Sequence, residues 1–203
     1  MKGVWEIQAE GVADSEPLLG SILRLAVADS RGAVNYDAAT LLGVRYVINL
    51  GGRSLDDVLN ESDVTYLNVR VTDKEDAILP LKPCLDFVRE AIAQCEAEKA
   101  MPYGAAPCTL LVNCRGAHSR SLSIAAASIM TFSNHHRTLS EALDLIVSCR
   151  GLENINSGFR AQLIEFEKCQ QQGGGQGDEV RPISSKERGR ENKKKKRKNK
   201  HKI

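Results

Sequence analysis

A cysteine and an arginine six positions apart, Cys114 and Arg120, offer the clearest chemistry in the sequence. They flank a short polar loop, which follows the apolar run 110–113 and precedes the helical stretch 122–132. Backbone N–H groups of such a loop can converge on an anion, and a helix N-terminus adds about half a positive charge. Arg120 can bind two phosphate oxygens at once, and the positive field favours a thiolate at Cys114. The pattern therefore predicts a phosphate-binding loop with a nucleophile, and a buried cysteine beside a solvated arginine is the alternative.

Cleavage of a phosphate ester also needs a proton on the leaving oxygen, which a carboxylic acid near the loop would supply. Asp73, Glu75 and Asp76 closely follow the alternating stretch 66–71, so this turn is a candidate source. The residues alone leave open whether the turn does chemistry or is a solvated acidic loop. No cluster of His, Cys and Asp has the spacing of metal ligands, so we expect neither a metal nor a cofactor.

Strand and helix patterns alternate along the chain, which predicts an α/β domain with a mixed, partly parallel central sheet flanked by helices. Short apolar runs or strict alternation indicate strands at 18–27, 44–50, 66–71 and 110–113. Helical spacing of apolar residues indicates helices at 81–95, 122–132, 139–149, around 159–166, and a short one at 36–42. Thr138 and Glu141 have the spacing of a capping box that would start the helix at 139. The loop after Cys114 would then join a strand to a helix.

The composition fits a single folded domain. Of the 203 residues, 42% are hydrophobic, which is enough for a substantial core. No apolar run is long enough to cross a membrane, and residues 1–10 lack the apolar segment of a secretory signal. The six cysteines show no paired spacing, so we expect free thiols in a reducing compartment.

Charge divides the chain into an acidic part and a basic tail. Residues 171–203 hold 12 Lys and Arg against 4 Asp and Glu, whereas residues 1–170 hold 16 against 22. We expect an N-terminal extension at 1–16, a catalytic domain at 17–170 and a disordered tail at 171–203. The unbroken basic run 193–198 is typical of segments that bind a nuclear import receptor or, weakly, RNA. The expected location is nuclear or nucleolar, with the cytoplasm as the alternative, and no membrane signal accompanies the charge.

Several segments resemble the dual-specificity protein phosphatases. Residues 113–121 (NCRGAHSRS) resemble the family signature H-C-x-x-G-x-S-R-S, and residues 156–163 (NSGFRAQL) resemble its N-x-G-F-x-x-Q-L segment. Residues 43–50 and 66–73 resemble its early strands, and residues 138–143 resemble a capped helix start of that family. The chain departs from the pattern at Asn113, where the family usually has His, at Ala117, where it usually has Gly, and at Ile155, where it usually has Pro.

The resemblance implies an atypical small phosphatase that acts on phosphotyrosine, phosphoserine or phosphothreonine in proteins through a cysteinyl-phosphate. It implies that Cys114 attacks phosphorus, that Asp73 is the general acid, and that Ser121 donates a hydrogen bond to the leaving thiolate. Asp76 is a second candidate for the acid. The implied substrate-binding residues are those of the loop: Arg115, Gly116, Ala117, His118, Ser119 and Arg120.

Two other functions fit parts of the pattern. A phosphate-binding protein without turnover would agree with the departures at Asn113 and Ala117. A phosphatase of RNA 5′ ends or of phosphoinositides would use a related loop, although such polyanionic substrates favour lysines that this loop lacks. A phosphoprotein substrate is therefore the expected partner.

Overall fold

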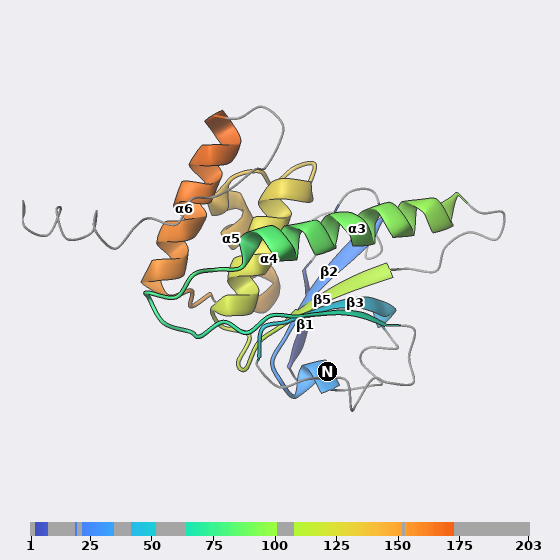
Figure 1. Ribbon diagram of the computed structural model, residues 1–203, viewed down its shortest axis with the longest axis horizontal. Coiled ribbons are helices and arrows are strands. Elements are labelled where there is room, and N and C mark those ends of the chain that lie inside the picture. The colour runs from blue at the N-terminus through green and yellow to red at the C-terminus, as the bar shows by residue number, and fades with distance from the viewer. Residues whose placement is uncertain are drawn as a thin grey trace, which may run out of the picture.

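Five strands form one sheet in the computed structural model of the chain, in the order β1-β2-β5-β3-β4 (Figure 1). The strands are β1 (Val4–Ile7), β2 (Leu23–Ala28), β3 (Val44–Asn49), β4 (Thr65–Asn68) and β5 (Cys108–Asn113). The structure describes residues 3–7, 19, 22–34, 42–51, 64–100, 108–151 and 153–172. The strands β2, β5, β3 and β4 are mutually parallel, and β1 pairs antiparallel to β2 at the edge. Carboxyl ends of four strands consequently meet along one edge of the sheet.

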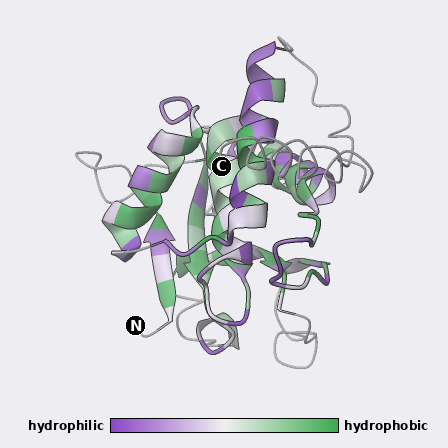
Figure 2. Cartoon of the chain, turned by 90° about the vertical axis from the view of Figure 1, so that its left-hand side faces the viewer, coloured by the Kyte–Doolittle hydropathy of each residue, from purple (hydrophilic) through white to green (hydrophobic). Residues whose placement is uncertain are grey.

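The central strand β5 lies between β2 and β3, and all six of its residues are buried. Parallel strands covered on both faces are usually continuous apolar runs rather than alternating ones, and β5 follows this rule with Leu110, Leu111 and Val112. In Figure 2 the strands at the centre of the molecule are accordingly mostly coloured as hydrophobic. The position of β5 means that whatever follows Asn113 emerges from the middle of the sheet edge.

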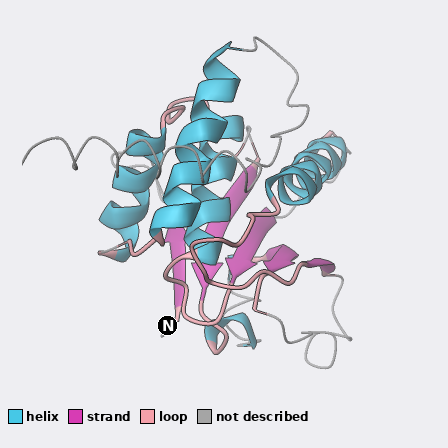
Figure 3. Cartoon of the chain, turned by 60° about the vertical axis from the view of Figure 1, so that its left-hand side comes forward, coloured by secondary structure: helices cyan, strands magenta, loops and turns pink. Residues whose placement is uncertain are grey.

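Among the described residues, four helices lie on one face of the sheet, and the short 3₁₀ helix η1 (Gly32–Val34) lies on the other (Figure 3). The helices are α3 (Leu81–Lys99), α4 (Arg120–Phe132), α5 (Leu139–Arg150) and α6 (Ser157–Gln172). Ten residues of α4 are buried because the helix packs between the sheet and the other three helices. The helix α6 packs on α4 and α5. No helix among the described residues is long and apolar enough to span a membrane.

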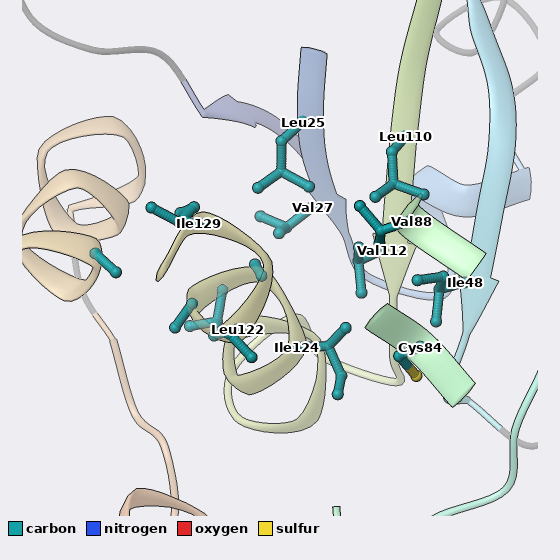
Figure 4. Close-up of a cluster of buried hydrophobic side chains, with 14 of the residues drawn as sticks. Leu25, Val27, Ile48, Cys84, Val88, Leu110, Val112, Leu122, Ile124 and Ile129 are labelled. Atoms are coloured by element: carbon teal, nitrogen blue, oxygen red, sulfur yellow. The ribbon is translucent and has the colours of Figure 1, made fainter. Parts of the chain in front are cut away.

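The main core fills the space between the sheet and the helices (Figure 4). Alternation along β2 places Leu25 and Val27 on the helix side, and Ala26 in a second, smaller cluster on the other side. A register shift between Val44 and Tyr46 changes the alternation in β3. The helix side of the core contains aliphatic residues of the strands and helices that Figure 4 labels: Leu25, Val27, Ile48, Val88, Leu110, Val112, Leu122, Ile124 and Ile129.

The expected α/β class with a mixed, partly parallel sheet is confirmed, as are the helices expected at 81–95, 122–132, 139–149 and around 159–166. The capping box is present, since Thr138 accepts from the Glu141 N–H and Glu141 accepts from the Thr138 N–H. The strand expected at 66–71 is shorter and occupies Thr65–Asn68, so residues 69–71 form a connection instead. The strand expected at 18–27 occupies Leu23–Ala28, with Leu19 as an isolated bridge.

The N-terminal segment contributes an element that the sequence patterns did not predict. Residues 4–7 of the expected extension form β1, whose Val4 and Ile7 pair with Ala28 and Leu25 of β2. Of the short helix expected at 36–42, only Leu42 lies among the described residues, and the basic tail beyond Gln172 also lies outside them.

Candidate active site

The loop between β5 and α4 starts at the carboxyl end of the central strand. Its first residues are held from both sides, because Cys114 N–H donates to the Ala28 carbonyl at 3.3 Å and Leu50 N–H donates to the Asn113 carbonyl at 2.8 Å. Ser30 donates to the Arg115 carbonyl through both its N–H and its hydroxyl, at 3.3 and 3.2 Å. The strand neighbours of β5 thus fix the start of the loop.

Cys114 lies at the base of this loop and is only 1% exposed. Burial alone would raise its pKa, but the hydroxyl and N–H of Ser121, the N–H of Gly116 and the charge of Arg120 outweigh burial. The pKa of Cys114 therefore lies below its usual value. The Ser121 hydroxyl is 3.2 Å from Sγ, and it becomes the donor once the thiol has ionised.

The other buried thiols behave in the opposite way. Cys84, Cys108 and Cys114 are all thiols outside any disulfide. Burial raises the pKa of Cys84 to about 12, and burial together with Cys95 raises the pKa of Cys108 to about 12. Neither has the hydrogen bonds to loop N–H groups that favour the thiolate of Cys114. The loop, and not burial as such, favours the thiolate form of Cys114.

Arg120 is fixed by carbonyl oxygens from two other strands' ends. Its Nη1 donates to the carbonyl of Leu50 at 3.0 Å and to that of Val71 at 3.2 Å. Its Nε lies 3.5 Å from Oδ2 of Asp73. The side chain is 12% exposed, so the guanidinium is held at the loop rather than free in solvent.

Asp73 is brought to the loop by this contact and by a hydrogen bond from Nδ2 of Asn156 at 2.8 Å. The oxygen of the same Asn156 side chain accepts from Phe159 N–H at 2.9 Å and so caps the start of α6. Capping is a common role for an asparagine at the start of a helix. The second role of Asn156, contact with a carboxylate more than eighty residues earlier, has no local signal in the sequence. Asp76 is exposed on the turn beyond Asp73.

The first turns of α6 also hold the rest of the acidic turn. Gln162 donates to the Ala77 carbonyl at 2.8 Å and accepts from Leu79 N–H at 2.9 Å. A Cβ at Gly158 would lie 1.8 Å from the Glu75 carbonyl oxygen, so only glycine permits this approach. The segment 156–163 therefore clamps the turn that carries Asp73 against the loop.

Asn113, which stands where the resembling family usually has His, belongs to a row of three asparagines at the strand ends. Its Nδ2 donates to Oδ1 of Asn49 at 3.1 Å, and Nδ2 of Asn49 donates to Oδ1 of Asn68 at 2.9 Å. Gly51 N–H also donates to Oδ1 of Asn49, which fixes the orientation of the row. The row ties β5, β3 and β4 together with neutral groups, so position 113 adds no positive charge.

Ala117 has a left-handed backbone, with φ of 52°, and is fully buried. An alanine would replace the family's glycine cheaply only at negative φ, so the loop is strained here. At Gly116 a Cβ would lie 2.8 Å from Cδ2 of His118, so any larger residue there would require the exposed His118 ring to shift. The remaining loop residues divide by burial: Arg115 and His118 are exposed, whereas Ser119 is buried and accepts from Asn156 N–H at 3.2 Å.

The described residues thus bring Cys114, Arg120, Ser121 and Asp73 to one loop, and they contain no group of three or more His, Cys, Asp or Glu suited to a metal ion. A strand–loop–helix segment that contains a buried cysteine with a lowered pKa and a hydrogen-bonded arginine is characteristic of the cysteine-dependent phosphatases. The family model "Dual specificity phosphatase, catalytic domain" matches residues 29–169. The chain belongs to this family.

Individual relatives agree with this assignment. Dual specificity protein phosphatase 1 of Arabidopsis thaliana is 37% identical over 111 residues, which are 54% of this chain and 49% of the relative. Dual specificity protein phosphatase 9 of Homo sapiens is 25% identical over 146 residues, which are 71% of this chain and 34% of the relative. The chain therefore spans half or less of these curated relatives.

Solved structures share the fold at low sequence identity. The Yvh1 phosphatase domain from Chaetomium thermophilum superposes with a TM-score of 0.57 at 19% identity, over 71% of this chain and 90% of that one. DUSP15 gives a TM-score of 0.57 at 24% identity, over 70% of this chain and 82% of that one.

Removal of the Ser121 hydroxyl tests the origin of the acidic thiol. In Ser121→Ala the pKa of Cys114 should rise, because its strongest ionisation-favouring contact is lost. Alkylation by iodoacetamide at pH 6 should then slow by about tenfold, in line with one charge-assisted hydrogen bond. Ser128→Ala is the matched control, since this buried α4 serine donates only to the Ile124 carbonyl. Equal pH profiles for Ser121→Ala and the wild type would refute this origin.

Substitutions at Ala117 test the strained loop. Glycine would relieve a left-handed conformation that costs alanine about 1–2 kcal/mol. Against this, glycine would raise the entropy of the unfolded chain, which destabilises the fold by about 0.4–1 kcal/mol. It would also remove a buried methyl group that contributes about 0.8 kcal/mol. Ala117→Gly should therefore change the free energy of unfolding in urea by less than about 1 kcal/mol. Ala117→Val should lower it by more than about 2 kcal/mol, since β-branched residues rarely adopt positive φ. Equal stabilities of the two variants would contradict the observed backbone.

Proposed function

We propose that this chain hydrolyses phosphate esters of phosphotyrosine, phosphoserine or phosphothreonine in proteins. One observation carries the proposal: a thiol with a lowered pKa, a held guanidinium and a carboxylate converge on one loop. Nucleophile, phosphate ligand and general acid are the three groups that the reaction needs.

In the first step the Cys114 thiolate attacks phosphorus, a P–S bond forms and the P–O ester bond breaks. Protonated Asp73 gives its proton to the leaving oxygen, so the substrate leaves as an alcohol or phenol. Loop N–H groups and Arg120 hold the equatorial phosphate oxygens as charge develops. In the second step water attacks phosphorus, Asp73 takes a proton from it, and the P–S bond breaks. The Ser121 hydroxyl, 3.2 Å from Sγ, then stabilises the departing thiolate.

The charge around the loop supports a phosphoprotein as substrate rather than an RNA 5′ end or a phosphoinositide. The loop itself contains Arg115 and His118 but no lysine, and Glu75 and Asp76 are exposed on the neighbouring turn. Acidic side chains on this turn disfavour a substrate that carries many phosphates. Retention of all four reactive residues supports turnover over mere phosphate binding, despite the departures at positions 113 and 117.

Three substitutions test the mechanism with an aryl phosphate and a phosphopeptide. Cys114→Ser should reduce hydrolysis to background but still bind tungstate, because the loop remains. Arg120→Ala should lose both. Asp73→Asn should slow phosphopeptide hydrolysis by about 10²- to 10⁴-fold, and slow an aryl phosphate with a good leaving group much less. The exposed Cys169 provides the control, since Cys169→Ser should behave as the wild type. Substantial turnover by Cys114→Ser would exclude the cysteinyl-phosphate.

For the basic tail we propose binding to a nuclear import receptor, with weak, salt-sensitive RNA contact and a nuclear or nucleolar location. Support comes from the sequence, since residues 193–198 are all Lys or Arg. The tail begins after α6, whose Gln170 still contacts Thr131 at 2.9 Å, so a truncation has to keep residues through 172.

Truncation after Gln172 should leave aryl phosphate hydrolysis unchanged, because every group of the loop is retained. The same truncation should move a fluorescently tagged protein from the nucleus towards the cytoplasm. A full-length variant with residues 193–198 changed to glutamine is the control for chain length. Identical distributions of the truncated and full-length proteins would rule out targeting by the tail.

A further inference from the structure

A stacked pair and a hydrogen bond connect the N-terminal strand to the phosphate loop. The guanidinium carbon of Arg150 lies 4.5 Å from the centroid of the Trp5 ring. On the other side, Nη2 of Arg150 lies 3.2 Å from Nδ1 of His118 in the loop. Since arginine only donates, Nδ1 of His118 accepts this bond. The contacts form a continuous chain from β1, through the end of α5, to the loop.

The fold brings these residues together from three distant parts of the sequence. Trp5 lies on the edge strand β1, over which α5 packs. Arg150 is the last residue of α5, and the left-handed Gly151, with φ of 86°, ends the helix there. Asn154 N–H then donates to the His118 carbonyl at 3.3 Å, so the chain after α5 also contacts the loop. Trp5 lies outside residues 29–169, which the family model matches.

Charged groups around Cys114 determine how readily its thiol ionises. On the α4 side, Cys114 interacts with the Arg120 guanidinium and the Ser121 hydroxyl. Asp73 in turn pairs with Arg120. Burial lowers the pKa of Arg150, whereas the negative charges of Cys114 and Asp29 act in the opposite direction. Arg150 is bonded to His118, which lies four residues beyond Cys114 in the same loop, and a guanidinium remains charged at neutral pH. Arg115 and His118 are exposed on the loop itself.

We propose that Arg150, stacked on Trp5 and bonded to His118, is a positioning residue that holds the outer turn of the phosphate loop and adds a second positive charge beside Cys114. The neutral asparagine row at Asn113 contributes no charge to the nucleophile, whereas Arg150, bonded to His118, brings a positive charge to the loop. The strand β1 then contributes to the site, because its Trp5 supports Arg150. This inference rests on the proposed function, but its test requires no turnover.

Two readouts on the full-length protein follow the thiolate and the anion site separately. Iodoacetamide is neutral, so its rate of Cys114 alkylation across pH 5–8 reports thiolate formation. Protection of Cys114 by tungstate reports binding of a phosphate-like anion. Arg150→Gln should be alkylated about three- to tenfold more slowly at pH 6 and should need about three- to tenfold more tungstate for protection, as expected for the loss of one nearby charge.

Conservative variants separate charge from packing. Arg150→Lys should recover most of the alkylation rate because the charge remains. Trp5→Phe should resemble the wild type, whereas Trp5→Leu, which keeps apolar bulk but removes the ring, should shift both readouts towards Arg150→Gln. Arg89→Gln is the matched control, because Arg89 also lies over an aromatic ring, that of Phe132 at 5.8 Å, but belongs to α3 and pairs with Asp86. Its profiles should not change.

Wild-type alkylation and tungstate protection in a folded Arg150→Gln would overturn the proposal. If Arg150→Gln does not fold, wild-type profiles in Trp5→Leu would overturn it equally. A full-length protein that fails to hydrolyse any phosphate ester, yet shows the expected shifts, would contradict the proposed function and leave the role of Arg150 supported.

Discussion

The two hydrogen bonds from Arg120 to the carbonyl oxygens of Leu50 and Val71 join three strand ends into one site. A side chain six residues beyond Cys114 would not be fixed by a short loop alone, because each long side chain loses about 2 kcal/mol of rotamer entropy when it is ordered. The carbonyls provide directed acceptors, and they are available because β3, β4 and β5 run parallel and end at the same edge. The same geometry places Asp73, two residues after Val71, next to the guanidinium. Strand direction is therefore the constraint from which the arrangement of the reactive groups follows.

Much of this arrangement could be predicted from the sequence, because its determinants are local. The strand before Cys114, the helix after Arg120 and the capping box at Thr138 all depend on neighbours within a few residues. The contacts of Asn156 and Gln162 with the acidic turn could not, since they join segments about 83 to 85 residues apart. The strand β1 escaped prediction because four residues give too short an alternation, and its pairing with β2 decides its structure.

Asn113 and Ala117 show two different ways in which a loop accommodates a departure from a family pattern. At Asn113 the side chain is buried and its amide donates to Asn49, so this residue is held by a hydrogen bond and brings no charge. At Ala117 the backbone keeps a conformation suited to glycine, and the methyl group is buried. One position alters electrostatics and the other stores strain, and neither displaces the thiol, which remains 3.2 Å from the Ser121 hydroxyl.

The opposite pKa shifts of the buried cysteines have a consequence for oxidative chemistry. Sulfenic acid formation requires a thiolate, and Cys84 and Cys108, with pKa values near 12, are almost entirely protonated at neutral pH. Cys114, with its lowered pKa, is the one of these three that hydrogen peroxide would oxidise first. Disulfide formation with the sulfenic acid also needs an attacking thiolate, and Cys84 and Cys108 supply almost none at neutral pH. A small thiol such as glutathione would therefore reduce an oxidised Cys114 more readily than Cys84 or Cys108 would.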